Sequence, residues 1–269
     1  MVAVLREDSD ETGLGDVEVV RHDGTTAGMR RIFEKTGPET VFHLAALVAG
    51  DARPEEDLEP LIRSNVLLGA QVAEAAVRTG AFKFVAAGTY YERRGGAGYD
   101  PVSLYAATKR AFADVLEYYA RATKLRAANL CLYDNYGPDD ERPKLLNLLA
   151  RHAASGETLK LSPGEQRLDL LHVKDSCAAF LAAEQALSTT SELGVREWCA
   201  SSGERVSLRS LVSIFEEATG LKVPAEFGGK PYRDREVMNP YSGPQIPGWK
   251  AAIPLKEGLR QVYGAAARA

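Results

Sequence analysis

The chain has 269 residues, of which 45% are hydrophobic and 26% charged, so it is long enough to bury a sizeable core as one large α/β domain or one domain with a smaller appended lobe. A net charge of −4 gives no support to a nucleic-acid-binding surface, which needs clustered cations. No apolar run approaches the roughly 18 residues of a membrane span, and the first residues turn acidic too soon for a secretory signal, so we expect a cytoplasmic protein.

Short apolar runs alternate with longer helical patterns along the first half of the chain. This alternation is typical of βαβ units around a buried parallel sheet. The patterns predict strands over 2–5, 17–20, 41–46, 82–87 and 125–133, and helices over 25–35, 58–79 and 102–124. Residues 134–138, with the sequence DNYGP, are predicted to turn.

The pattern becomes irregular beyond residue 138. Helices are predicted over 145–155, 176–187 and 208–219, and strands over 159–161 and 196–200. Frequent proline and glycine between 222 and 253 predict a smaller lobe with long loops.

Tyr105 and Lys109 stand four residues apart in the segment SLYAATKR, within the predicted helix over 102–124. Positions i and i+4 share a helix face, so the Lys109 ammonium can lie close to the Tyr105 phenol. A nearby cation favours the phenolate and lowers the tyrosine pKa from about 10, as acid–base catalysis near neutral pH requires. The alternative is a surface pair that stabilises the helix by roughly a few tenths of a kcal/mol.

Histidine and cysteine are assigned to packing rather than to chemistry. His43 lies within an apolar strand and is a better candidate for a core histidine than for a general base, and His172 is treated in the same way. The cysteines are odd in number and lack the paired spacing of a zinc or redox site, which predicts no metal centre and buried thiols in a reducing compartment: Cys131, Cys177 and Cys199.

Several motifs occur in a fixed order along the chain. They are Asp23, HLAA at 43–46, Asn65 in SNVLLGAQ, YAATK at 105–109, YDNYGP at 133–138, GEQRLDLLHVKD at 164–175 and PGWKAAIPLKEGL at 247–259. On these motifs, and over almost its whole length, the chain resembles the extended short-chain dehydrogenase/reductases of the NAD-dependent epimerase/dehydratase family. Within that family it is most similar to nucleotide-sugar 4-ketoreductases and epimerases such as the CDP-abequose synthases.

The resemblance implies an α/β fold with a Rossmann-like, doubly wound parallel sheet that binds NAD or NADP. Residues 1–138 would form the cofactor-binding domain, with later strands returning from 170–205. Residues 139–269 would form mainly a smaller C-terminal substrate-binding lobe. The family also implies a homodimer that pairs through the helices over 58–79 and 102–124.

The resemblance also implies roles for individual residues. Tyr105 would be the acid–base at a sugar hydroxyl or ketone, while Lys109 would support it and hold the nicotinamide ribose. The other cofactor residues would be Asp23 at the adenine, Arg6 at a 2′-phosphate if the cofactor is NADP, and Leu44, Ala45 and Ala46 along the cofactor. The substrate residues would be Asp134, Asn135 and, for the pyrophosphate, Arg235, with Arg233 as its rival.

Several of these residues also have simpler explanations. Asp23 precedes Gly24 and can build a turn, as can the neighbouring Asp134 and Asn135. Arg6 can be the solvated end of a strand.

The sequence departs from the family in its phosphate-binding loop. In a dinucleotide-binding fold a glycine-rich turn follows the first strand, and the ribose-selecting residue comes about 20 residues later. Arg6 and Glu7 already occupy that later position, so the usual first strand, its loop and its helix have no room. The segment Gly13-Leu-Gly15 leads into a strand and is a poor substitute. Either the flanking strands pair directly, something else fills the gap, or the N-terminus is lost or misassigned, and we expect the last.

A second departure lies at the end of the strand over 82–87. Relatives carry a serine or threonine where this chain has Ala87, and Thr89 could supply the hydroxyl from the same strand face if the backbone stays extended. The acidic pair of the dehydratases is missing here, which disfavours dehydration.

Two functions are consistent with these features. The first is an NAD(P)-dependent oxidoreductase or epimerase acting on a nucleotide-activated deoxysugar, with hydride transfer at a sugar carbon such as C4 and proton transfer by Tyr105. The second is a repurposed scaffold without redox activity, serving as a cofactor-independent catalyst or a binding subunit.

Overall fold

The computed structural model describes residues 1–48, 58–190 and 192–264. The chain divides into two compact units that alternate along the sequence. The first unit comprises residues 1–88, 104–129 and 184–197, and the second comprises 89–103, 130–183 and the residues from 198 onward. Each unit therefore contains residues from both sides of position 138, the boundary predicted from the sequence.

The principal sheet has four strands in the order β3-β4-β5-β9. They are β3 (Thr40–His43), β4 (Lys83–Thr89), β5 (Arg126–Leu132) and β9 (Val195–Ala200). Strands β3 and β4 are parallel, with Thr40 opposite Lys83 and His43 opposite Ala86. The buried apolar runs of β4 and β5 are typical of strands covered on both faces. The predicted α/β fold class, Rossmann-like with parallel strands, is confirmed.

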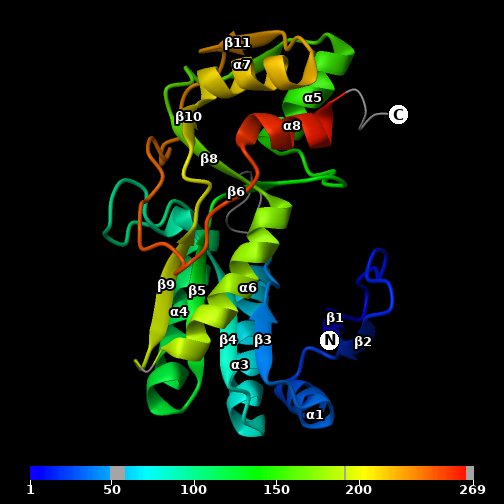
Figure 1. Cartoon of the computed structure of the whole chain (residues 1–269), viewed down its shortest axis with the longest axis vertical. Helices are drawn as coiled ribbons and strands as arrows, with labels where there is room; N and C mark the ends of the chain where they lie inside the picture. Colours follow the sequence, from blue (N-terminus) through cyan, green and yellow to red (C-terminus); the bar gives the residue numbers. More distant parts are fainter. Residues whose placement is uncertain (49–57, 191, 265–269) are drawn as a thin grey trace. The chain divides into compact units, whose positions relative to one another are not determined.

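Two further strands, β1 (Val2–Arg6) and β2 (Glu18–His22), form a separate parallel pair, drawn in blue in Figure 1. Within the described residues β1 is not hydrogen-bonded to β3, so the direct pairing considered for the flanking strands does not occur. Gly13 and Gly15 have positive φ angles of 86° and 56° in the connection between β1 and β2. This connection ends in a strand, whereas a phosphate-binding turn would end in a helix.

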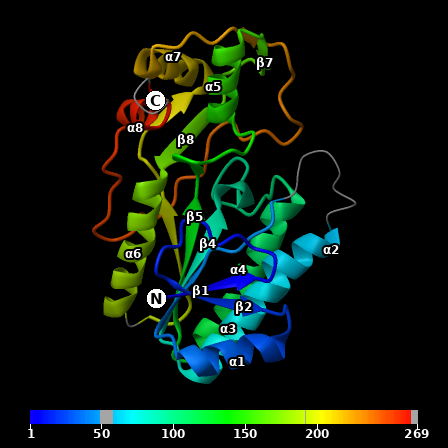
Figure 2. The ribbon, with the colours of Figure 1, turned by 90° about the vertical axis from the view of Figure 1, so that its right-hand side faces the viewer.

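The helices of the first unit pack on one another through α3. They are α1 (Thr26–Thr36), α2 (Leu58–Leu61), a π-helical turn over Ile62–Leu67, α3 (Leu68–Thr79) and α4 (Leu104–Ala122). Helix α3 contacts both α1 and α4 (Figure 2). The core between helices and sheet contains Phe33 of α1, Ala73 and Ala76 of α3, Phe84 of β4 and Phe112 of α4. No helix in the described ranges is both long and apolar enough to cross a membrane.

The second unit is built on two small sheets. One has the order β10-β8-β6 and the other pairs β11 with β7. The strands are β6 (Asp134–Tyr136), β7 (Leu159–Leu161), β8 (Arg167–His172), β10 (Arg205–Ser207) and β11 (Ala225–Phe227), and the helices are α5 (Leu145–Ser155), α7 (Leu208–Thr219) and α8 (Leu255–Tyr263). Helix α6 (Val173–Thr189) begins in this unit and ends in the first. The core of the second unit includes Leu149, Leu211, Phe215 and Leu259.

The prediction that residues 134–138 form a turn is wrong for the first three of them. Asp134–Tyr136 form β6, which pairs in parallel with β8 and places Asn135 opposite Leu171. Asp and Asn favour turns through local side-chain bonds, but here a tertiary strand partner overrides that preference. The chain leaves the strand only at Gly137.

Candidate functional site

Tyr105 and Lys109 lie one helical turn apart at the start of α4, which begins at Leu104. The spacing places both residues on one face of the helix. Tyr105 is partly buried, whereas the Lys109 side chain is only 2% exposed. Burial, together with the positive charge of Lys109, lowers the pKa of His43 to about 3, so His43 is neutral at pH 7.

His43 lies in the core, as predicted. It is 4% exposed and packs edge-on against Phe112, with ring centroids 5.1 Å apart. Its Nε2 atom has no hydrogen-bond partner in the described part of the chain. A neutral ring in this position adds no second charge beside the Lys109 ammonium.

Asn65 connects the loop after β3 to the first turn of α4. Its amide oxygen accepts a hydrogen bond from Leu47 N at 2.8 Å, and its amide nitrogen donates to Leu47 O at 2.9 Å and to Thr108 Oγ1 at 3.0 Å. The Thr108 hydroxyl in turn donates to the backbone oxygen of Tyr105 at 2.7 Å. Asn65 is fully buried in the π-helical turn, a conformation that is rare and frequent at functional sites. The sequence singled out Asn65 only as part of a motif and gave it no role.

The predicted cofactor residues fall into two groups. Leu44, Ala45 and Ala46 are exposed and directly precede Leu47, so they belong to the loop that Asn65 holds. Arg6 and Asp23 instead make local contacts in and after the β1–β2 pair. The Arg6 Nε atom lies 3.6 Å from Asp8, and Asp23 accepts hydrogen bonds from Thr25 N at 2.9 Å and Thr25 Oγ1 at 2.7 Å, which is the turn geometry that its position before Gly24 also suggested.

Thr89 ends strand β4 with an extended backbone, at φ −149° and ψ 144°. The backbone therefore stays extended, as the substitution of Thr89 for the missing hydroxyl requires. Residues two apart on an extended strand project from the same face, so Thr89 shares the face of Ala87. The Thr89 side chain is buried, and its Oγ1 accepts a hydrogen bond from Tyr91 N at 3.3 Å. That bond caps the short 3₁₀ turn Tyr90–Glu92.

Asp134 receives a hydrogen bond from the Tyr90 hydroxyl, 3.2 Å from its Oδ2 atom. Tyr90 stacks on Tyr133, with centroids 5.3 Å apart and an interplanar angle of 13°. Burial raises the pKa of Asp134 to about 6, although the Tyr90 hydrogen bond and the charges of Lys144 and Arg233 act in the opposite direction. Asp134 is therefore a carboxyl group whose titration range approaches neutral pH. Tyr90 and Tyr91 follow Thr89 directly in the sequence, but the sequence alone predicted no role for this tyrosine pair.

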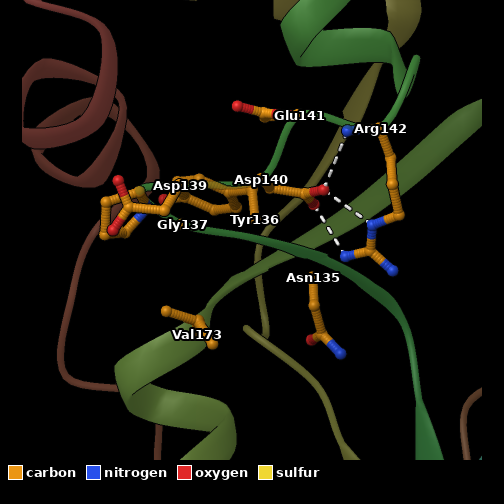
Figure 3. A pocket seen from close by; sticks show the side chains of 9 residues that line it. Asn135, Tyr136, Gly137, Asp139, Asp140, Glu141, Arg142 and Val173 are labelled. Carbon is orange, nitrogen blue, oxygen red and sulfur yellow. Dashed lines mark hydrogen bonds and ion pairs between the residues drawn. The ribbon is translucent and has the colours of Figure 1, made fainter. Parts of the chain in front are cut away.

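Asn135 lies at the edge of a cavity of about 430 Å³ (Figure 3). Its side-chain oxygen accepts a hydrogen bond from Ser176 Oγ at 2.8 Å. The cavity is lined by Asn135, Tyr136, Gly137, Pro138, Asp139, Asp140, Glu141, Arg142 and Val173. Arg142 binds Asp140 through two hydrogen bonds of 2.6 and 2.8 Å, and this pairing lowers the pKa of Asp140 to about 2. Polar side chains thus line much of the cavity, and the Asp140 carboxylate and the Arg142 guanidinium already bind each other.

Arg235, predicted to hold a pyrophosphate, is engaged within the protein. Its Nε atom donates to Pro101 O at 3.0 Å, and its guanidinium forms an ion pair with Asp100. Asp100 also pairs with Arg94 at 3.0 Å. The rival Arg233 acts through its charge on Asp134 and on Tyr91, so Arg233 shares the environment of Asp134. Among the residues whose placement is described, no cluster of His, Cys, Asp or Glu is suited to holding a metal ion.

The chain is similar to proteins of a known family. The sequence pattern of the "NAD dependent epimerase/dehydratase family" matches residues 2–193. CDP-abequose synthase of Yersinia pseudotuberculosis is 29% identical over 207 residues, which are 76% of this chain and 70% of that protein. UDP-glucose 4-epimerase of Mycolicibacterium smegmatis is 24% identical over 90% of this chain and 80% of its own length.

Solved structures show the same architecture. MoeE5 in complex with UDP-glucuronic acid and NAD superposes with a TM-score of 0.80 at 25% identity, covering 97% of this chain and 89% of its own. UDP-glucose 4-epimerase from Brucella ovis in complex with NAD superposes with a TM-score of 0.84 at 19% identity, covering 99% and 90% of the two chains, which supports the fold alone.

Proposed function

Because the chain belongs to the NAD dependent epimerase/dehydratase family, we propose that it is an NAD(P)-dependent oxidoreductase or epimerase acting on a nucleotide-activated deoxysugar. One observation carries the proposal: the Asn65 side chain fixes both the exposed loop before Leu47 and the turn of α4 that bears Tyr105. This network holds the backbone of Tyr105 one helical turn from the buried Lys109, and a phenol near an ammonium suits proton transfer at a sugar oxygen.

The chain's own residues would carry the proton and orient the sugar. Tyr105 would give a proton to a sugar ketone oxygen, or remove one from a hydroxyl, and the Lys109 ammonium would stabilise the phenolate through its charge. The Thr89 hydroxyl would hydrogen-bond the same oxygen in place of the residue missing at Ala87. A bound nicotinamide would supply or accept the hydride.

The described residues fit one part of that cofactor and not another. The exposed loop Leu44–Ala46 and the segment of α4 that carries Lys109 are linked through Asn65 and Thr108, and they suit the nicotinamide ribose and its surroundings. The pyrophosphate needs a glycine-rich turn leading into a helix, and no such turn occurs in the described part of this chain. MoeE5 and two UDP-glucose 4-epimerases have been solved with NAD. We therefore assign residues to the nicotinamide end alone.

The substrate proposal rests on the second unit. Asp134 and Asn135, with Arg233 or Arg235, would bind the diphosphate and the sugar, since guanidinium groups match phosphate oxygens and carboxylates accept hydrogen bonds from sugar hydroxyls. The similarity to CDP-abequose synthase favours a deoxysugar, and MoeE5 has been solved with UDP-glucuronic acid. A homodimer remains part of this proposal.

The direct test mixes the purified protein with NADH or NADPH and a panel of CDP- and UDP-linked 4-keto-6-deoxy sugars. Quenching of the nicotinamide fluorescence reports cofactor binding, and its loss over time reports reduction. Binding followed by sugar-dependent oxidation is the expected result. No binding at millimolar cofactor would reject the proposal.

A second function is favoured by two observations of the chain itself. The residue at position 87 is alanine, and the described residues contain no glycine-rich strand–turn–helix. A repurposed scaffold, acting without cofactor or as a binding subunit, would retain the Asn65 network for stability only. In that case the same nucleotide sugars would bind without any effect of NADH or NADPH on their affinity.

A further inference from the structure

Cys131 and Cys199 meet on neighbouring strands, β5 and β9. Both are free thiols, 6% and 1% exposed, and their side chains are hydrogen-bonded to one another. Both belong to one buried cluster, and the roughly 4.4–6.8 Å between Cα atoms that a disulfide spans is compatible with residues side by side on neighbouring strands. The third cysteine, Cys177, is exposed on α6.

The surroundings of the pair shift the pKa values of its two thiols in opposite directions. Hydrogen bonds from the Cys131 thiol and Gly243 N, with the charge of Arg93, lower the pKa of Cys199 against the effect of burial. The pKa of Cys131 is raised by its bond to Cys199, by burial and by the charge of Glu92. The surroundings therefore favour the thiolate on Cys199 and the thiol on Cys131. A thiolate in contact with a second thiol is the arrangement of a reactive and a resolving cysteine.

We propose that Cys131 and Cys199 are a reversible redox pair that closes to an intramolecular disulfide on exposure to a hydroperoxide. The Cys199 sulfur attacks one peroxide oxygen, the O–O bond breaks, and the departing oxygen takes a proton and leaves as water. The resulting sulfenic acid is attacked by the Cys131 sulfur, so that the S–S bond forms, the S–O bond breaks and a second water leaves. The two thiols lose two electrons and two protons, and hydrogen peroxide is reduced to two waters.

The pair is connected to the aromatic residues around Asp134. Cys131, Cys199, Tyr90, Tyr133 and Val237 form one buried cluster. The Tyr133 hydroxyl donates to Tyr241 O at 2.5 Å, and Tyr133 stacks on Tyr90, which holds Asp134. Closing the disulfide would strain this cluster, and if the proposed function is right, oxidation would also change substrate affinity. The disulfide itself does not depend on that function.

The test oxidises the full chain with hydrogen peroxide, unfolds it in an alkylating agent and maps the tryptic peptides by mass spectrometry. The expected product joins the peptide 127–144 to the peptide 197–205, and dithiothreitol reverses it. Cys177→Ser is the matched control and should form the same link. In Cys131→Ser, dimedone should trap a sulfenic acid on Cys199.

Two results would overturn the proposal. One is full alkylation of Cys131 and Cys199 after peroxide treatment, and the other is cross-linking through Cys177 alone. The pH dependence gives an independent readout, because the rate of disulfide formation should be half-maximal at a lower pH than for an ordinary thiol. A rate that rises steadily to about pH 8.5, as for an ordinary thiol, would show that Cys199 is not activated.

Discussion

The Asn65 amide donates a hydrogen bond to the Thr108 hydroxyl across 3.0 Å and thereby joins the π-helical turn before α3 to the first turn of α4. The same amide group binds the backbone of Leu47 on both its donor and its acceptor side. Three segments distant in the sequence are thus fixed by one fully buried side chain. The positions of Tyr105 and of the loop before Leu47 depend on this residue.

Asn65→Ala should lower the free energy of unfolding by roughly 2–4 kcal/mol, because the N–H and C=O of Leu47 each lose a buried partner. Denaturant unfolding of both proteins measures the loss. Thr108→Val, combined with Asn65→Ala in a double-mutant cycle, should show a coupling energy of about 1 kcal/mol. Additive effects of the two changes would mean that the Asn65–Thr108 bond contributes nothing.

His43→Gln should change how stability depends on pH. The folded pKa is lowered to about 3, so between pH 6 and pH 4 only the unfolded state of the wild type takes up this proton. The contribution of His43 to the free energy of unfolding is therefore fully present above the unfolded pKa, near 6.5. Below that pH the contribution falls by about 1.4 kcal/mol for each unit of decreasing pH. Unfolding curves at several pH values should show the variant losing less stability in acid. Parallel pH profiles of the two proteins would contradict a buried neutral imidazole.

Asp134→Asn should stabilise the protein relative to the wild type, and the gain should be larger at pH 7 than at pH 4. Burial raises the folded pKa to about 6, so the wild type loses stability as the pH rises from the unfolded value toward 6. Removing the ionisable group should gain about 1–3 kcal/mol at pH 7. The exposed Asp139→Asn in the following loop is the control and should show no comparable gain. Equal pH profiles for wild type and Asp134→Asn would place the carboxyl in water.

Asp100→Asn should tighten nucleotide-sugar binding about 2- to 10-fold if Arg235 binds the diphosphate, because Asp100 competes for the same guanidinium. Arg235→Ala should weaken binding, and Asp114→Asn on α4, which removes the ion pair with Arg110, serves as a control. Calorimetric titration measures each dissociation constant. Unchanged affinity in both Asp100→Asn and Arg235→Ala, with a loss in Arg233→Ala, would assign the diphosphate to Arg233.

The sequence predicted the parts of the fold whose patterns are local. Helix α5 and strand β7 have the predicted bounds, and the apolar runs of β4 and β5 are displaced by only one or two residues. Strand β6 and its partner β8 were missed because their pairing is tertiary. The close approach of Tyr90 to Asp134, 44 residues apart, is likewise set by the fold.

The candidate site shows the same division. The Tyr105–Lys109 spacing is a local property of α4 and could be predicted, as could the burial of His43. The π-helical turn that presents Asn65 has no sequence pattern distinct from an ordinary helix, so its hydrogen bonds to Leu47 and Thr108 could not be foreseen. The engagement of Arg235 by Asp100 depends on residues 135 positions apart.

We propose that Tyr105 moves the proton while a bound nicotinamide exchanges a hydride with the sugar. The most direct measurement is the single-turnover rate of NADPH or NADH oxidation with a nucleotide-linked 4-keto-6-deoxy sugar, in the wild type, in Tyr105→Phe and in the control Tyr118→Phe on the same helix. We expect the rate to fall roughly 10²- to 10⁴-fold in Tyr105→Phe, with unchanged cofactor binding, and to stay the same in Tyr118→Phe. Equal rates in the wild type and Tyr105→Phe would contradict it.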